Sequence, residues 1–172
     1  MLFVNILQRK DLFEFICELV YQEWKTYYNK ININSSDELI VMFENDYINK
    51  SNKNNKLNKF NNIFLLFDKI NSINQLVGFV TISEDDLQGY KKIEKNSLFI
   101  NEIYILKNYR KLGYGKKLIK YGIEYIKNLN FKTYISVQKK ELLGYYRKLG
   151  FIEVDNYNLD NQEYIIMEYL LD

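Results

Sequence analysis

The residue pattern with the clearest chemical meaning runs from Arg110 to Lys116, with the sequence Arg-Lys-Leu-Gly-Tyr-Gly-Lys. It follows an apolar, strand-like segment at residues 97–105 and precedes apolar residues that recur at helical spacing from Leu118 onward. The first turn of a helix has backbone N–H groups without internal partners, and the helix dipole adds partial positive charge there. Glycines at this place let a ligand come close to the backbone. The pattern therefore predicts a turn that binds phosphate.

Two common phosphate-binding motifs do not fit this turn. A Walker loop has four residues between its glycines, whereas one residue separates Gly113 from Gly115. A dinucleotide fingerprint requires a third glycine, and Leu118 occupies its position. What fits the residues is the pattern Arg-x-x-Gly-x-Gly.

A second recognisable pattern follows about thirty residues later, where residues 145–151 read Tyr-Tyr-Arg-Lys-Leu-Gly-Phe. The first pattern resembles the pyrophosphate-binding motif of the GNAT superfamily of acetyl-CoA-dependent N-acetyltransferases. The second resembles that family's aromatic-Tyr-x-x-x-Gly-Phe signature. Through these motifs the resemblance covers roughly residues 76–151, and outside this range it rests on the order of the predicted elements.

The predicted elements alternate between strand-like and helix-like patterns. Strands are predicted at residues 2–7, 63–68, 75–83, 97–105, 132–138, 151–154 and 163–171, and helices from Asp11, from Ser35, after the glycine-containing turn and at 141–149. This order is that of the GNAT fold. We therefore predict an α/β (α+β) protein whose central mixed, mostly antiparallel sheet has about seven strands and about four helices. The resemblance implies that the sheet is splayed between its fourth and fifth strands.

Local signals mark the first two helices. Asp11 is a candidate N-cap before an apolar stripe, and Ser35-Ser-Asp-Glu38 has the pattern of a capping box. Cys17 on the first helix is predicted to be a core side chain rather than a nucleophile. Trp24, Tyr27 and Tyr28 could line a substrate groove or pack in the core, and core packing is the favoured interpretation.

Two polar segments are predicted to be loops. Residues 49–62 are rich in asparagine and lysine and cannot support a packed core. We expect a mobile surface loop there, within a single GNAT domain spanning residues 1–172, and a nucleic-acid contact is the alternative. The acidic run Glu84-Asp-Asp86 is either an ordinary solvated loop or an attraction for a cationic acceptor.

Composition excludes several kinds of chemistry. The chain of 172 residues has no histidine, which excludes Ser-His-Asp and Cys-His catalysis and histidine-ligated zinc. With one cysteine, Cys17, it has no internal disulfide and no cysteine-based metal site. A net charge of +2 argues against a general nucleic-acid surface. Without an apolar run of membrane-spanning length or a signal-peptide pattern, we expect a cytoplasmic monomer or homodimer with no membrane partner.

The resemblance assigns a coenzyme to the turn. It implies that residues 110–116 hold the pyrophosphate of coenzyme A, mostly through backbone N–H groups, while Arg110 and the lysines add positive charge. It also implies that the pantetheine arm pairs with the backbone of Ile103 and Ile105 like an additional strand. An amide N–H near Ile105 would then polarise the thioester carbonyl.

One position departs from the family pattern. Many members have an asparagine seven residues before the motif tyrosine, and this chain has Lys139 there. We expect Lys139 to meet a phosphate of the coenzyme instead. The predicted coenzyme contacts are Ile103, Tyr104, Ile105, Arg110, Lys111, Leu112, Gly113, Tyr114, Gly115, Lys116, Lys139 and Tyr146.

Two residues are predicted to be catalytic. Glu102 lies in the middle of an apolar strand, where a carboxylate is costly unless it has a purpose. We predict that it is the base that deprotonates an amine acceptor, with a buried ion pair or a water-exposed edge position as alternatives. The resemblance implies that Tyr146 gives a proton to the departing thiolate, with a core tyrosine as the alternative. Tyr145 is assigned to packing.

Taken together, the motifs predict an acetyl-CoA-dependent N-acetyltransferase. The acetyl group would pass to a primary amine by direct attack in a ternary complex, with no metal ion. A small-molecule amine or a polyamine is the favoured acceptor, and a protein N-terminus or lysine is the alternative. A coenzyme A-binding module without turnover is a further alternative, against which the presence of Glu102 and Tyr146 counts.

Overall fold

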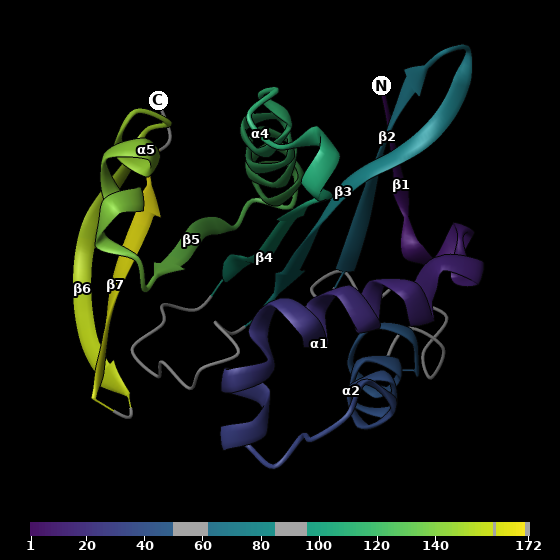
Figure 1. The fold of residues 1–172 in the computed structure, drawn as a ribbon. Helices are drawn as coiled ribbons and strands as arrows, with labels where there is room; N and C mark the ends of the chain where they lie inside the picture. Colours follow the sequence, from purple (N-terminus) through teal and green to yellow (C-terminus); the bar gives the residue numbers. More distant parts are fainter. Residues whose placement is uncertain (50–61, 85–95, 160, 171–172) are drawn as a thin grey trace. The chain divides into compact units, whose positions relative to one another are not determined.

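The structure is a computed structural model that describes residues 1–49, 62–84, 96–159 and 161–170. Most of the predicted asparagine- and lysine-rich loop at residues 49–62 lies outside the described residues, as do Asp85 and Asp86. In the described chain, seven strands form one sheet in the order β1-β2-β3-β4-β5-β7-β6 (Figure 1). The predicted mixed seven-stranded fold is therefore confirmed.

The chain forms two compact units, Met1–Phe79 and Val80–Asp172, and β3 (Ile73–Ser83) runs from one into the other. The prediction of a single domain over residues 1–172 stays a prediction.

In the first unit, β1 (Leu2–Asn5) pairs antiparallel with β2 (Asn62–Ile70). A two-residue turn leads from β2 into β3. Its residues, Asn71 and Ser72, both have positive φ, 51° and 66°. This is the backbone of a type I′ turn, whose twist matches that of the two flanking strands.

The first helix starts later than the sequence predicts. Asp11 lies in a short 3₁₀ turn (Lys10–Leu12), and α1 spans Phe13–Lys30 with Leu12 at its N-cap. The Asp11 carboxylate instead forms an ion pair with Arg9 at 2.7 Å. The predicted N-cap role of Asp11 is therefore wrong, because a neighbouring cation holds the side chain that was expected to cap the helix.

The buried face of α1 is apolar, as predicted. Cys17 has no exposed surface, so its assignment to the core is confirmed. The helix is kinked at Trp24, where φ and ψ are −113° and 22°. After the kink Tyr28 is buried, while Trp24 and Tyr27 are half-buried.

One of the two hydrogen bonds of the predicted capping box is present at the start of the second helix. The Ser35 side chain accepts a hydrogen bond from the Glu38 backbone N–H at 3.2 Å. The Glu38 carboxylate accepts from the backbone of Asn34, at 2.6 Å, rather than from that of Ser35. The helix, α2 (Ser36–Phe43), continues into a π-helical turn at Glu44–Asn49.

In the second unit, β4 (Ser97–Ile105) and β5 (Lys132–Val137) form the parallel pair of the sheet. Their pairing is short: it begins at Ser97↔Lys132 and ends at Phe99↔Tyr134. The remaining two-thirds of β4 has no partner in β5. The predicted splay between the fourth and fifth strands is therefore confirmed.

The helix α4 (Tyr114–Asn128) packs against β4 (Figure 1). Their approach is close at Gly122, where an added Cβ would lie 3.0 Å from Cδ1 of Ile100. Glycine is therefore the residue that lets α4 lie this near the strand. The buried positions of the helix are Tyr114, Leu118, Ile119, Gly122, Ile123 and Ile126.

The chain ends with α5 (Leu143–Arg147), β6 (Phe151–Leu159) and β7 (Gln162–Tyr169). The strand β6 is longer than the predicted residues 151–154. Between Glu153 and Asp155 its pairing with β7 shifts by one residue, and pairing then continues to Leu159. Such a bulge interrupts the alternation of side chains between the two faces of β6. The polar second half of β6 therefore lacked the pattern that predicts a strand.

Candidate active site

The turn before α4 has a left-handed backbone at two positions. Lys111 has a φ of 64°, and Gly113, the N-cap of α4, has a φ of 83°. The first hydrogen bond within the helix runs from the Lys117 N–H to the Gly113 carbonyl at 3.3 Å. The three intervening N–H groups, of residues 114–116, therefore have no acceptor within the helix and can bind an anion.

The turn leaves room for such an anion. Apart from its chain neighbours, no atom of the described residues lies within 4 Å of the position that a Cβ on Gly113 would take. Leu112 is 62% exposed, and the side chains of Lys111 and Lys116 are exposed. The N–H groups of a helix start, open space and two cations together fit a pyrophosphate group.

Arg110 reaches from the turn to the end of β4. Its Nε donates a hydrogen bond to the Ile105 carbonyl at 2.9 Å, and its guanidinium lies 5.4 Å from the centre of the Tyr104 ring. Its predicted contact with the pyrophosphate stays a prediction. In the structure it links the turn to the strand segment predicted to bind the pantetheine arm.

That strand segment lies within the splay. Ile103 and Ile105 are half-buried and Tyr104 is buried. Because β5 stops pairing with β4 at Phe99, the β4 edge beyond Phe99 has no strand partner on its β5 side in the described chain. An extended ligand could pair with this edge as a short strand does.

Glu102 is buried in β4, with 9% of the residue exposed. The hydroxyl of Thr81, on β3, donates a hydrogen bond to its carboxylate and accepts one from its backbone N–H at 3.0 Å. Thr81 is itself completely buried. The carboxylate is thus held by the neighbouring strand, and Glu102 is little exposed although it lies in the part of β4 that β5 does not pair with.

β4 is irregular at this point. The side chain of Asn101, next to Glu102, donates a hydrogen bond to the Ser83 hydroxyl. Thr81 and Ser83 are two residues apart and share a face of β3, whereas successive residues of a regular strand point to opposite faces. Asn101 and Glu102 both turn to that one face, as residues at a β-bulge do.

Glu102 points away from α4. A Cβ on Gly122 of α4 would meet the side chains of Ile100 and Ile82, so both of these point toward the helix. Thr81 precedes Ile82 and therefore points to the other face of the sheet. Glu102, which is bonded to Thr81, lies on that other face.

Tyr146 is held by aromatic neighbours. Its ring packs edge-on against Phe151, with centroids 6.0 Å apart, and against Tyr145 at 5.3 Å. Burial, with a smaller contribution from Tyr145, raises the pKa of Tyr146 to about 12. The hydroxyl is therefore a proton donor and not a base throughout the neutral range.

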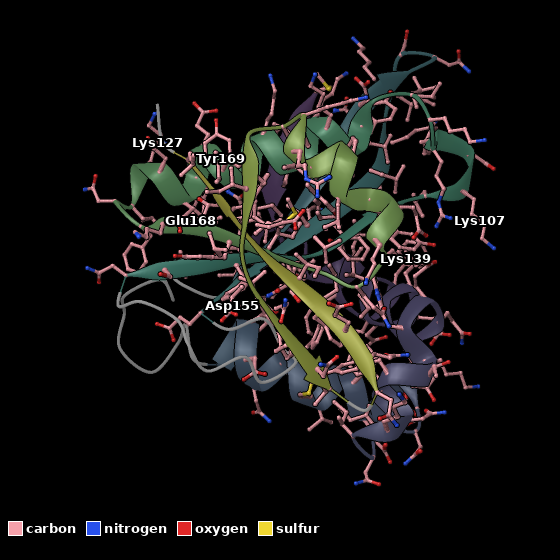
Figure 2. All side chains as sticks on the ribbon, turned by 90° about the vertical axis from the view of Figure 1, so that its left-hand side faces the viewer. Lys107, Lys127, Lys139, Asp155, Glu168 and Tyr169 are labelled. Atoms are coloured by element: carbon pink, nitrogen blue, oxygen red, sulfur yellow. The ribbon has the colours of Figure 1, made fainter. Side chains whose placement is uncertain are left out.

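Lys139 is exposed and precedes the 3₁₀ turn that leads into α5. Figure 2 shows it on the same side of the view as Lys107, which begins the short turn (Lys107–Tyr109) before the glycine-containing segment. Lys127, in the last turn of α4, lies on the opposite side of that view.

Two residues at the site were not predicted. Thr81 gave no signal because its partner Glu102 lies on another strand. Tyr145 was assigned to packing, and its ring does pack against Tyr146, but the place of its hydroxyl was not predicted: its oxygen lies 3.6 Å from the position that a Cβ on Gly115 would occupy. The two sequence motifs, far apart in the chain, therefore meet at Gly115 and Tyr145.

In the described part of the chain, no group of three or more Cys, Asp or Glu side chains is placed to hold a metal ion. No helix among the described residues is both long and apolar enough to cross a membrane.

The chain is similar in sequence to one protein family and in fold to several solved structures. A model of the acetyltransferase (GNAT) family matches residues 17–151. A candidate streptothricin acetyltransferase of Bacillus anthracis, in complex with acetyl coenzyme A, is 23% identical, with a TM-score of 0.54 over 74% of this chain and 68% of that one. Mutant forms of the spermidine/spermine N-acetyltransferase of Vibrio cholerae are 20% identical, with a TM-score of 0.54 over 78% of this chain and 76% of that one.

A longer match has lower identity. A candidate GNAT-family acetyltransferase of Desulfovibrio desulfuricans is 8% identical, with a TM-score of 0.62 over 97% of this chain and 96% of that one. At these identities the likeness to the solved structures shows a shared fold.

Proposed function

Because the chain belongs to the acetyltransferase (GNAT) family, we propose that it transfers an acetyl group from acetyl-CoA to a primary amine by direct attack in a ternary complex. Membership makes the protein an acyltransferase and confirms the resemblance of its two motifs. The observation that carries the proposal is the open turn before α4, with its three N–H groups, next to a splayed β4.

In this proposal the turn at residues 111–116 holds the pyrophosphate, and Lys139 meets a phosphate. The pantetheine arm lies along β4 beyond Phe99, against the backbone of Ile103 and Ile105. Because Arg110 binds the Ile105 carbonyl, it fixes the end of the edge along which the arm lies. The bound thioester supplies the activated acetyl group.

Glu102 is the proposed base. An alkyl ammonium has a pKa near 10, about that of lysine, so the acceptor must lose a proton before its nitrogen can attack. A positioned carboxylate contributes roughly 10²–10⁴-fold to such a step, directly or through one water. The two hydrogen bonds between Glu102 and Thr81 support this role because they hold the carboxylate in one place.

Tyr146 is proposed to act on the sulfur of the leaving group. An ordinary thiol has a pKa of about 8.5, and burial raises the pKa of Tyr146 to about 12. The buried Tyr146 hydroxyl is therefore a weaker acid than an ordinary thiol in water. A hydrogen bond from the hydroxyl to the sulfur, formed as negative charge develops, is the form of acid assistance that this pKa favours.

The proposed acceptor is a small-molecule amine or a polyamine, with a protein N-terminus or lysine as the alternative. Two of the structures that share the fold are named for small-molecule acceptors, streptothricin and spermidine/spermine. A coenzyme A-binding module without turnover is a second alternative, and the placement of Glu102 and Tyr146 favours an enzyme over it.

The test is a panel of monoamines, polyamines and peptides, each incubated with acetyl-CoA and followed by the release of free thiol. We expect acceptor-dependent release from the parent protein. Gly113→Val is the matched control, since its side chain would fill the open space at the turn. It should lose both the turnover and the rise in melting temperature that acetyl-CoA causes in the parent. Binding of acetyl-CoA without thiol release for any acceptor would favour the binding module, and no binding at all would refute the proposal.

A further inference from the structure

The hydroxyl of Tyr145, on α5, lies beside the first turn of α4. Tyr145 is 38% exposed, and in the described chain no group hydrogen-bonds to its hydroxyl. That hydroxyl is the single neighbour within 4 Å of a Cβ built on Gly115. Gly144, one residue earlier, would point a Cβ into open space. A glycine inside a helix costs up to about 1 kcal/mol relative to alanine, and no described atom requires it here.

The distances suit a ligand atom shared by α4 and α5. A Cβ lies about 2.5 Å from the backbone nitrogen of its own residue, so the Tyr145 oxygen lies within about 6 Å of the Gly115 nitrogen. The Gly115 N–H has no acceptor within the helix, because the first helical bond is that of Lys117. One acceptor atom that receives two hydrogen bonds of about 2.9 Å can join donors up to about 6 Å apart.

The chemistry of the two donors specifies the acceptor. Partial burial raises the pKa of the Tyr145 hydroxyl, so it keeps its proton at neutral pH and can donate it to a hydrogen bond. The first turn of α4 carries partial positive charge and favours an anion. An anionic oxygen makes shorter and stronger hydrogen bonds than a neutral one does.

We propose that Tyr145 is a further coenzyme-binding residue, whose hydroxyl donates a hydrogen bond to a phosphoryl oxygen that is also bound by the Gly115 N–H. This inference rests on the proposed function, because it takes the pyrophosphate of coenzyme A as the anion at the turn. It gives the exposed tyrosine of the second motif a role in affinity, separate from the role of Tyr146 at the sulfur.

The experiment compares the parent with Tyr145→Phe, which keeps the ring and removes the hydroxyl. Titration calorimetry with coenzyme A gives the Kd, and kcat/KM is measured with S-acetylpantetheine, a thioester that lacks the pyrophosphate. Loss of a hydrogen bond to a charged group should raise the Kd for coenzyme A about 10-fold. The kcat/KM for S-acetylpantetheine should not change. Tyr125→Phe, which alters a half-buried tyrosine on α4, is the control and should change neither quantity.

Three outcomes would contradict the expectation. An unchanged Kd for coenzyme A in Tyr145→Phe would overturn the inference and leave the proposed function in place. Equal losses with coenzyme A and with S-acetylpantetheine would also overturn it, because they would show that Tyr145 acts through packing. If the parent itself does not bind coenzyme A, the proposed function fails and the inference fails with it.

Discussion

Glu102 and Tyr146 are both buried, yet neighbours of different kinds hold them in place. Glu102 is bonded to a hydroxyl on the adjacent strand, and Tyr146 is packed between aromatic rings. A carboxylate in such a position can accept a proton, whereas a phenol with a pKa of about 12 can only donate a hydrogen bond at neutral pH. These contrasting surroundings match the two proposed roles of base and donor.

The raised pKa of Tyr146 makes the stability of the fold depend on alkaline pH. Burial raises this pKa to about 12, from about 10 in an unfolded chain. The folded state therefore holds the proton more tightly, and the resulting stabilisation is complete below about pH 10 and lost as the pH rises through about 12. Two pKa units correspond to about 3 kcal/mol.

Tyr146→Phe should therefore lose less stability than the parent between about pH 10 and 12, as measured by urea unfolding at each pH.

At neutral pH the same variant should show a turnover number reduced by roughly 10- to 10³-fold and an unchanged Kd for coenzyme A, because the hydroxyl acts in the transition state. An unchanged turnover number, under conditions where the chemical step limits the rate, would show that Tyr146 serves packing and not catalysis.

The absence of histidine sharpens a test of Glu102. No side chain of this protein has an ordinary pKa between about 5 and 8. If Glu102 is the base, no histidine can take over its role, and Glu102→Gln should lower kcat by roughly 10²–10⁴-fold. A Gln variant with the kcat of the parent would show that Glu102 is structural.

At the scale of elements, the contact between α4 and β4 positions the proposed phosphate site. A Cβ on Gly122 would lie 3.0 Å from Cδ1 and 3.2 Å from Cγ1 of Ile100, which is closer than side chains normally pack. Because the first turn of the same helix is the proposed coenzyme-binding turn, a shift of α4 at Gly122 would also move that turn.

Gly122→Ala should therefore destabilise the protein by about 1–3 kcal/mol through overpacking, partly offset by a gain of up to about 1 kcal/mol in helix propensity. Adding Ile100→Val removes the nearest atom, so the double variant should recover much of the loss in a double-mutant cycle. Gly144→Ala, whose Cβ meets no atom within 4 Å, is the control and should not destabilise. Additive effects of the Gly122 and Ile100 changes would argue against this contact as the cause.

The elements that the sequence predicted well are those with local signals. β4 spans residues 97–105, as predicted, because a mostly apolar run, broken in its middle only by Asn101 and Glu102, is followed by a turn with two glycines. Asp11 failed as an N-cap because Arg9, two residues away, forms an ion pair with it. β6 was predicted too short because its second half, around the bulge, is held by pairing with β7.

At the scale of the whole molecule, the candidate site also has parts that local sequence signals predict and parts that depend on contacts between distant segments. The Arg-x-x-Gly-x-Gly pattern located a helix start that leaves N–H groups open, which is a property of one short segment. The bond between Thr81 and Glu102 joins residues 21 positions apart, and the contact between Gly115 and Tyr145 joins two motifs. Contacts of this kind depend on how strands and helices assemble, so no local sequence pattern predicts them.

The order of the last strands has a consequence for biosynthesis. β7 lies between β5 and β6 in the sheet, although it follows both of them in the sequence. While the chain is being translated, β6 leaves the ribosome before the strand that will join it to the rest of the sheet. Since domains tend to fold as they are synthesised, β6 has no neighbouring strand to pair with until residues 162–169 have emerged. A chain interrupted between the two strands would carry every residue of both motifs and still lack the strand that attaches β6 to the sheet.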